Sequence, residues 1–371
     1  MAATKNILLN GGLLLVSVCL SLLLLEQGFR IRLFGWQAFD VAALRNNVPV
    51  NNAGIMRQSA YDDIYWELLP NLDTTFKMAH LHTNSYGLAD QEYPLAKPHN
   101  TYRIAVLGDS YSMASGVDTD KSYHALLEDW MNRQDEAHPD DHSRVHYEFI
   151  NFAVGGFGLE RYNATLAHKV AAWQPDAILL GYCGFNDHMA LPPATGKVPP
   201  FNPPRADGFW MSYVLAYINM KKDDMKKNDM KNSEIKKSDT KKTGGKMTAG
   251  TQKNIIPFAL NQSHFEFIER ELGKTRALAD SIGPGMPIVL AYLDNRPHAA
   301  NDLQTIAAIA KKSGMAFVDT SEQFADKDLD DYSIQLLDSH PNDKAQQLFA
   351  ETLFASIKSG HWFGFQPAGV P

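Results

Sequence analysis

A serine follows an apolar run in a position where it could do chemistry. The segment RIAVL, residues 103–107, is followed at once by Gly108, Asp109 and Ser110. A serine hydroxyl is a weak nucleophile at neutral pH and needs an adjacent general base, a task that suits histidine. Ser110 is therefore a candidate nucleophile. The alternative is that these residues form only a strand-to-helix turn with a helix cap.

Three other segments carry groups that acyl transfer requires. Asp338 and His340 stand together in LLDSHPND, where the aspartate would fix the histidine tautomer and stabilise the imidazolium. An oxyanion needs preorganised donors, and the backbone N–H groups of Ser110 and Gly156 with the amide of Asn186 are candidates. The sequence thus predicts Ser110, Asp338 and His340 as catalytic residues, and Ser110, Gly156 and Asn186 as the oxyanion hole.

Each of these residues also has a purely structural interpretation. Taken alone, Gly156 belongs to a tight turn, Asn186 caps a turn, and His340 lies at the surface. Asp187 and His188 compete for a role, and we expect them to support their loop by hydrogen bonds. The order of the four motifs favours the catalytic interpretation, because each stands at a predicted strand end or in the loop before the last helix.

The elements that would position these residues alternate between strands and helices. Helical candidates with apolar spacing of three and four separate the strands, as in YHALLEDWMNRQ. This alternation predicts a parallel sheet covered on both faces, with ligands beyond the carboxyl ends of the strands. The predicted strands cover residues 103–107, 147–154, 177–182, 287–293 and 316–320.

A final helix is predicted directly after the segment that holds His340. Asp343 and Gln346 form a plausible capping pair at its start. Its apolar stripe comprises Ala345, Leu348, Phe349, Leu353 and Ile357.

Four blocks of the chain together resemble the SGNH (GDSL-type) hydrolases. The blocks are GDS at 108–110, the glycine in NFAVGGFG, GFND at 184–187 and DSHP at 338–341, within a resemblance that covers roughly residues 80–358. It implies a three-layer α/β/α flavodoxin-like fold and an esterase, lipase or carbohydrate deacetylase that uses no metal or cofactor. The family's functional residues fall on Ser110, Gly156, Asn186, Asp338 and His340.

Two departures from the family pattern point to a subgroup. Gly-Asp-Ser-Tyr replaces GDSL, and Asp338-x-His340 replaces the wider Asp-x-x-His spacing. The tighter spacing, with an NS-x-GL segment at 84–88, is similar to membrane-anchored bacterial members. This resemblance implies an inner-membrane protein with a periplasmic catalytic domain. No G-x-S-x-G occurs, which argues against an α/β-hydrolase nucleophile elbow.

The N-terminus predicts the anchor itself. ILLNGGLLLVSVCLSLLLL, residues 7–25, carries no charge and is long enough to span a bilayer. No small-residue cleavage site follows it, so an uncleaved anchor is expected. The flanking positive charges leave its orientation open. The predicted organisation is an anchor over 1–30, a membrane-proximal stem over 31–95 and a hydrolase domain over 96–360.

A lysine-rich insertion interrupts the hydrolase domain at about 221–253. Its degenerate five-residue repeat, KKDDM KKNDM KNSEI, cannot form an apolar stripe, because five residues advance a helix by about 140° beyond one turn. We expect a disordered basic surface segment. A merely solvated loop and a site for an anionic partner both remain open.

Composition excludes some classes of protein. The 371 residues are 44% hydrophobic and 21% charged, which is ordinary for a globular protein. The net charge of −7 gives no indication of nucleic-acid binding. The two cysteines, Cys19 and Cys183, make a disulfide framework improbable, since Cys19 lies in the apolar stretch.

The leading functional hypothesis is a serine esterase that removes an O-acyl group, most plausibly acetyl, from a cell-surface glycan. An O-acetyltransferase with the same triad is one alternative, and a membrane-tethered binding or assembly protein without turnover is another. The complete triad argues against the last. The expected partners are an acyl-ester substrate such as a polysaccharide and, through the N-terminal helix, the membrane.

Overall fold

Five apolar runs form one parallel sheet in a computed structural model of the chain, which describes residues 2–40, 55–136, 145–184, 187–190, 212–222, 260–296 and 300–365. The strand order, β6-β5-β7-β8-β9, is that of flavodoxin-like doubly wound folds. The predicted three-layer α/β/α fold with a parallel sheet is therefore confirmed. The strands are β5 (Thr101–Leu107), β6 (His146–Asn151), β7 (Ala177–Cys183), β8 (Ile288–Leu293) and β9 (Ala316–Asp319).

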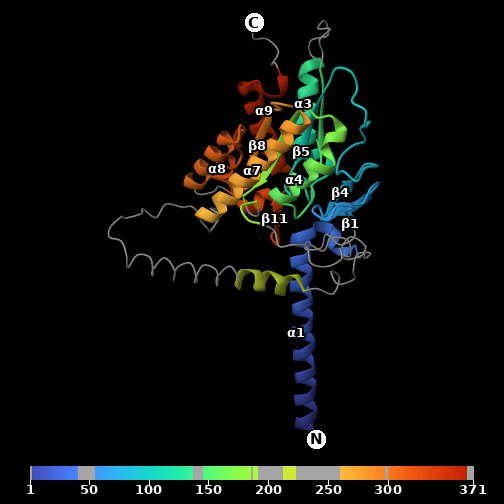
Figure 1. Ribbon diagram of the computed structural model, residues 1–371. Coiled ribbons are helices and arrows are strands. Elements are labelled where there is room, and N and C mark those ends of the chain that lie inside the picture. Colours follow the sequence, from blue (N-terminus) through green and yellow to red (C-terminus); the bar gives the residue numbers. More distant parts are fainter. Residues whose placement is uncertain are drawn as a thin grey trace, which may run out of the picture. The chain divides into compact units, whose positions relative to one another are not determined.

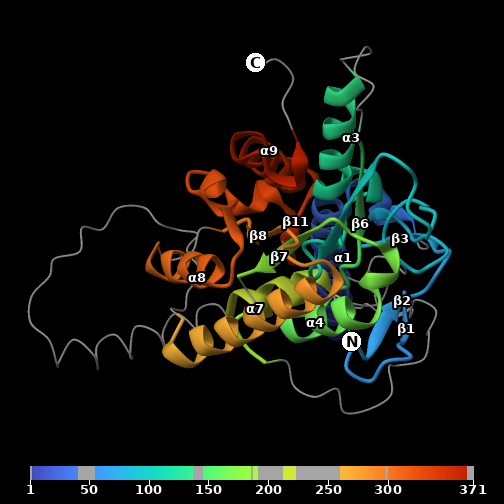
Figure 2. The same cartoon turned by 45° about the horizontal axis from the view of Figure 1, so that its top comes forward.

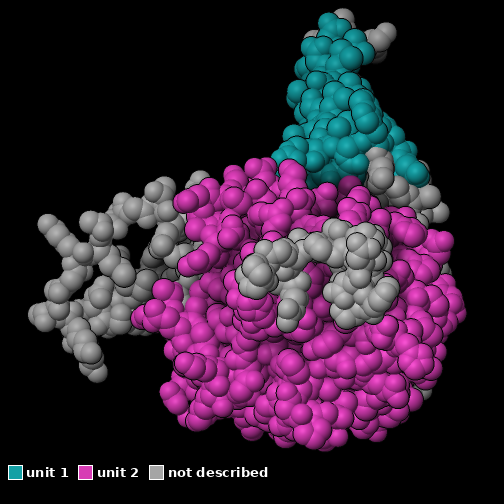
Figure 3. All heavy atoms as spheres, turned by 90° about the horizontal axis from the view of Figure 1, so that it is seen from above, with its two compact units in different colours: residues 1–49, 204–251, 335–337 teal, residues 50–203, 252–334, 338–371 magenta. Residues whose placement is uncertain are grey.

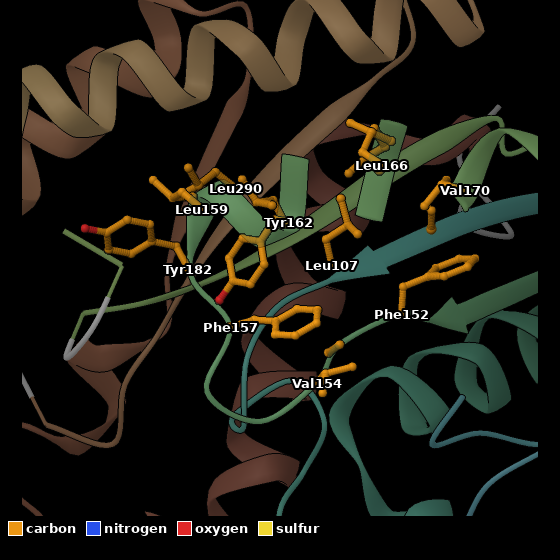
Figure 4. Close-up of a cluster of buried hydrophobic side chains, with 14 of the residues drawn as sticks. Leu107, Phe152, Val154, Phe157, Leu159, Tyr162, Leu166, Val170, Tyr182 and Leu290 are labelled. Carbon is orange, nitrogen blue, oxygen red and sulfur yellow. The ribbon is translucent and has the colours of Figure 1, made fainter. Parts of the chain in front are cut away.

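Both faces of the sheet are buried, which explains why its strands are mostly apolar. The charged residues Arg103 of β5 and Glu148 of β6 are buried as an ion pair. Successive side chains of β5 enter different clusters: Ala105 and Leu107 belong to one, and Ile104 and Val106 to the other. Figure 4 shows part of the first cluster, where Leu107 of β5 lies among side chains of β7, β8 and α4.

Different helices cover the two faces of the sheet (Figures 1 and 2). Apolar side chains of α4 (Leu159–His168), α7 (Gln262–Ile282) and α8 (Ala300–Lys312) join the cluster that contains Leu107. Those of α3 (Tyr123–Glu136) and α9 (Asp343–Gly360) join the opposite cluster. Polar residues follow two of the strands closely: Asp109 and Ser110 come after β5 and a single glycine, and Asp294 comes directly after β8, so the turns at the carboxyl edge of the sheet can present polar groups.

The start of α9 differs from the prediction. Asn342, not Asp343, is the cap: its side chain accepts a hydrogen bond from the Ala345 N–H at 3.1 Å. The predicted pairing of Asp343 with Gln346 is therefore wrong. The preceding segment also differs, because Asp338–Pro341 form the short strand β11, beside β10 (Ser333–Gln335), where a loop was expected.

Gln346 links other segments instead of capping α9. Its side chain is fully buried. Its Oε1 accepts from the Tyr123 N–H at the start of α3, and its Nε2 donates to the carbonyl of Tyr111, both at 3.0 Å. Tyr111 directly follows Ser110. One side chain of α9 thus fixes both the first turn of α3 and the turn after β5.

Two small antiparallel sheets precede β5. In the β3–β4 hairpin, only Lys77 and Met78 separate the strands, and their φ values are 49° and 72°. Two consecutive residues with positive φ are the signature of a type I′ turn, which matches the twist of paired strands. The strands are β1 (Met56–Gln58), β2 (Trp66–Leu68), β3 (Asp73–Phe76) and β4 (Ala79–His82).

The chain divides into two compact units, one made of residues 1–49, 204–251 and 335–337 and the other of the remainder (Figure 3). The first contains α1 (Ala2–Phe34). Its segment Leu9–Phe34 has a mean hydropathy of 2.0 and is long and apolar enough to cross a membrane, a test that a signal sequence also passes. Residues 9–25 are exposed, whereas Leu33 and Phe34 at the end of the helix are buried. From residue 223 onward the predicted lysine-rich insertion lies outside the described residues.

Gln346→Met tests the link between α9 and the turn after β5. The substitution keeps the side-chain length but leaves the Tyr123 N–H without its partner and removes one of two donors to the Tyr111 carbonyl, which also accepts from the Ala114 N–H at 3.3 Å. Because a buried unsatisfied group costs about 1–3 kcal/mol and a lost hydrogen bond about 1 kcal/mol, we expect the free energy of unfolding to fall by about 2–4 kcal/mol in urea denaturation. Gln347→Met, at the exposed next position, is the control. Equal stability of the two variants would show that the link is unimportant.

Candidate active site

The turn after β5 is shaped by Gly108 and Asp109. The Asp109 carboxylate is buried and accepts a hydrogen bond from the Tyr111 N–H at 2.8 Å, which closes a tight side-chain turn around Ser110. A Cβ at Gly108 would lie 2.4 Å from the Cβ of Ser112, so only glycine fits there. Ser110 itself is half-buried. The sequence Gly-Asp-Ser thus holds the hydroxyl at the carboxyl end of a central strand.

The structure brings Ser110, His340 and Asp338 together. The Ser110 Oγ lies 3.0 Å from the Nε2 of His340 across 230 residues of sequence. The Nδ1 of the same ring is hydrogen-bonded to Asp338 Oδ1, which also accepts the His340 backbone N–H at 3.1 Å. Because an ionised carboxylate only accepts, Nδ1 carries the proton and Nε2 presents its lone pair to the serine.

Asp338 is nearly buried, with 5% of its side chain exposed. The Nζ of Lys77 lies 2.9 Å from the second carboxylate oxygen, Oδ2. Burial opposes ionisation, but the hydrogen bond from His340 and the charges of His340 and Lys77 outweigh it, so the pKa of Asp338 is held well below its ordinary value. The carboxylate therefore stays ionised wherever His340 can act as a base.

Lys77 was not predicted from the sequence. It comes from the β3–β4 turn, in the segment expected to be a stem, and 8% of its side chain is exposed. A lysine between two short strands reads as a solvated turn residue, and its contact with Asp338 spans most of the chain. No local sequence signal indicates it.

Tyr111 lies against the imidazole ring of His340. Its ring centroid is 5.7 Å from that of His340, with 59° between the ring planes. Its hydroxyl accepts a hydrogen bond from Arg296 Nη2 at 3.3 Å, and Arg296 in turn forms an ion pair with the fully buried Asp294. The tyrosine that departs from the GDSL pattern thus borders the imidazole, and residues after β8 hold it there.

The predicted oxyanion donors are only partly placed. Gly156 is exposed with φ at +79°, in a turn tied to the nucleophile turn by the Val154 N–H, which donates to the Gly108 carbonyl at 3.2 Å. Within the described part of the chain, neither the Ser110 N–H nor the Gly156 N–H donates to another protein group. Asn186 lies outside the described residues.

Asp187 supports the turn after β7, as predicted. Its buried carboxylate accepts from the Tyr162 hydroxyl at 3.0 Å and from the Cys183 N–H at 2.8 Å. Burial and the nearby charge of Asp109 raise the pKa of Asp187 well above its ordinary value. His188 is also buried, with its ring 4.9 Å from that of His264. These contacts occupy both residues in structure rather than at Ser110.

A cavity of about 950 Å³ lies over β4 and α3, and neither Ser110 nor His340 lines it. Burial raises the pKa of Glu128, in its wall, to about 7. The Glu128 carboxyl accepts from the Tyr93 hydroxyl and the Phe149 N–H, both at 2.7 Å, so it joins α3 to neighbouring segments. Among the residues that the structure describes, no group of three His, Cys, Asp or Glu is arranged to hold a metal ion.

Comparison with known proteins gives only remote likenesses. No family model matches the chain, and no curated protein matches its sequence. Similar solved structures include TesA, at 15% identity and a TM-score of 0.37, covering 69% of this chain and 98% of that one. A catalytic mutant of Axe2, an acetylxylan esterase from Geobacillus stearothermophilus, is 12% identical, with a TM-score of 0.39 and coverage of 73% and 97%. CEX, a two-domain esterase active on acetylated mannans, is 13% identical, with a TM-score of 0.39 and coverage of 69% and 49%.

Asp338→Asn tests whether the aspartate sets the tautomer of His340. An asparagine has only one acceptor oxygen. When that oxygen accepts from Lys77, its NH2 group faces Nδ1, so we expect the imidazole to carry its proton on Nε2, which faces Ser110. We expect kcat on p-nitrophenyl acetate to fall by about 10⁴-fold, the size known for a trapped tautomer. The control is Asp343→Asn, in the exposed first turn of α9. Wild-type turnover by Asp338→Asn would contradict this role.

Proposed function

We propose that the chain is a serine esterase that hydrolyses an O-acyl ester through an acyl-serine intermediate, with acetyl as the proposed acyl group. One observation carries the proposal: Ser110 Oγ lies 3.0 Å from His340 Nε2 while Asp338 holds the opposite ring nitrogen. That distance is within the reach a general base requires. The half-buried hydroxyl stands at the carboxyl end of β5, where doubly wound folds bind ligands.

Acylation begins with transfer of the Ser110 proton to His340 Nε2 as Oγ attacks the acyl carbon. The imidazolium that forms is stabilised by the ionised Asp338. When the tetrahedral intermediate collapses, the C–O bond to the alcohol breaks and His340 returns its proton to the leaving oxygen. The acyl group then remains on Ser110 and the alcohol departs.

Deacylation repeats these steps with water as the nucleophile. The oxygen of a water molecule attacks the acyl carbon while His340 takes one of the water protons. His340 then gives this proton to Ser110 Oγ when the ester bond to the enzyme breaks. The products are a carboxylic acid and the free serine. A sugar hydroxyl in place of water would complete an acyl transfer by the same steps.

Three donors are proposed for the oxyanion: the backbone N–H groups of Ser110 and Gly156 and the amide of Asn186. The turn that holds Gly156 is hydrogen-bonded to Gly108 through Val154, which supports a position beside the nucleophile. The exposure of Gly156 and its left-handed backbone also support an N–H available to substrate.

The proposed substrate is an O-acetylated cell-surface glycan, with no metal or cofactor involved. The proposed organisation is an anchor over residues 1–30, a stem over 31–95 and a hydrolase domain over 96–360, the last in the bacterial periplasm. The long apolar segment Leu9–Phe34, whose residues 9–25 are exposed, supports the anchor. The motif resemblance to membrane-anchored bacterial SGNH hydrolases supports the compartment and the domain.

Ser110→Ala tests the nucleophile. We expect a folded protein whose hydrolysis of p-nitrophenyl acetate falls to background and which no longer reacts with a fluorophosphonate probe. Ser115 lies in the same turn, but its hydroxyl donates a hydrogen bond to the Met113 sulfur. Ser115→Ala should therefore keep both properties. Peptide mapping should place the wild-type adduct on Ser110, and an adduct on another serine in active protein would refute the assignment.

Asn186→Ala tests the side-chain oxyanion donor. Loss of one such donor lowers kcat by about 10²–10³-fold. We expect that loss in steady-state kinetics with an unchanged melting temperature, because the effect belongs to the transition state. A variant that unfolds, or one with unchanged kcat, would assign Asn186 to the structure of its turn instead.

A further inference from the structure

The ammonium group of Lys77 lies on the side of the Asp338–His340 pair opposite the nucleophile. Its Nζ is 2.9 Å from Asp338 Oδ2 and 3.2 Å from His340 Nδ1, whereas Ser110 contacts Nε2. Because Nδ1–H already donates to Asp338 Oδ1, the lysine cannot donate to that nitrogen. Lys77 therefore acts on the ring through its charge and through Asp338.

The backbone holds Lys77 in this position. The type I′ turn fixes the φ of Lys77 and Met78 in the left-handed region. Gly116, at the end of the turn that begins with Ser110, lies against the side chains of Ile334 and Lys77: a Cβ on Gly116 would lie 2.2 Å from Ile334 Cδ1 and 3.2 Å from Lys77 Cβ. The ammonium thus reaches the pair from a rigid turn packed on the nucleophile's own segment.

Two electrostatic effects of this ammonium have the same sign. A positive charge beside the ring disfavours the second positive charge of an imidazolium. The same ammonium shares the negative charge of Asp338, which weakens the field that stabilises the imidazolium. Both effects disfavour the imidazolium relative to an Asp–His pair without the ammonium.

We propose that Lys77 is a positioning residue that sets the pH range in which His340 serves as the base. The inference rests on the proposed function, since it concerns the same serine and histidine. It adds a fourth member to the site, supplied by the hairpin before the sheet. Its consequence is activity that extends to more acidic pH.

Other charged or titratable groups around the pair are less directly placed. Tyr111 lies against the His340 ring, and Arg296 with its partner Asp294 stands behind the Tyr111 hydroxyl. Asp343 and Lys344, at the start of α9, are exposed to solvent, which screens them. Among the lysines and arginines that the structure describes, Lys77 is the one that forms an ion pair with Asp338.

The test compares pH profiles of kcat/KM for p-nitrophenyl acetate in the full-length protein. Lys77→Met keeps most of the length of the side chain and removes its charge, so we expect the midpoint of the acid limb to rise by about one pH unit. Lys77→Arg keeps the charge and should keep the midpoint. Lys121→Met removes an exposed lysine paired with Asp118 and is the matched control for net charge.

A second measurement does not depend on turnover. The ring protons of His340, assigned by their absence in His340→Gln, are titrated by NMR in wild type and in Lys77→Met. A higher titration midpoint in Lys77→Met, with no change in Lys121→Met, supports the proposal even if the wild type hydrolyses no ester, in which case only the proposed function fails.

Unmoved midpoints in both measurements, with activity lowered equally at every pH, would overturn the proposal and make Lys77 a packing residue. If Lys77→Met does not fold by circular dichroism, Lys77→Gln takes its place with the same expected shift. An unmoved midpoint there overturns the proposal equally.

Discussion

The contact between Ser110 and His340 is the constraint on which the rest of the site depends. The turn after β5 and the short strand β11 must bring Ser110 Oγ and His340 Nε2, 230 residues apart in sequence, to within 3.0 Å at the carboxyl edge of a sheet whose two faces are already packed. Gln346 joins these two segments, because it lies on the helix that follows His340 and donates to the carbonyl of the residue after Ser110. Tyr111 adds a side-chain contact between the same two segments. The geometry of the pair is thus built into the packing of α9 rather than left to flexible loops.

Burial of Asp338 creates the second requirement. A carboxylate with 5% exposure is costly unless its oxygens are paired, and here one oxygen contacts His340 while the other contacts Lys77. The same pairing that makes this charge tolerable also fixes the imidazole tautomer. The β3–β4 hairpin therefore contributes to the electrostatics of the site. The type I′ turn of this hairpin, which carries Lys77, thus has a functional reason for its left-handed backbone.

The sequence predicted the sheet well because its strands are buried on both faces and are therefore rich in apolar residues. The placement of Ser110, Asp338 and His340 near one another followed from strand ends and motif order. The start of α9 was harder to predict, since Asn342 and Asp343 are adjacent residues that both cap helices well. In addition, Gln346 makes tertiary hydrogen bonds instead of taking part in the cap. Lys77 was beyond prediction, because its partner lies across the fold and its local context is that of an ordinary turn. The predicted role of Asn186 stays a prediction.

The most direct test of the central claim is to trap the acyl-enzyme. Full-length protein is mixed with p-nitrophenyl acetate for milliseconds to seconds, quenched in acid and mapped by peptide mass spectrometry. A catalytic Ser110 activated by His340 predicts acetyl on the peptide that contains Ser110, formed at the rate of the p-nitrophenol burst. It also predicts that this acetyl is absent in His340→Gln. Acetyl on any other residue at that rate, or hydrolysis with no acetyl-serine under any quench time, would contradict it.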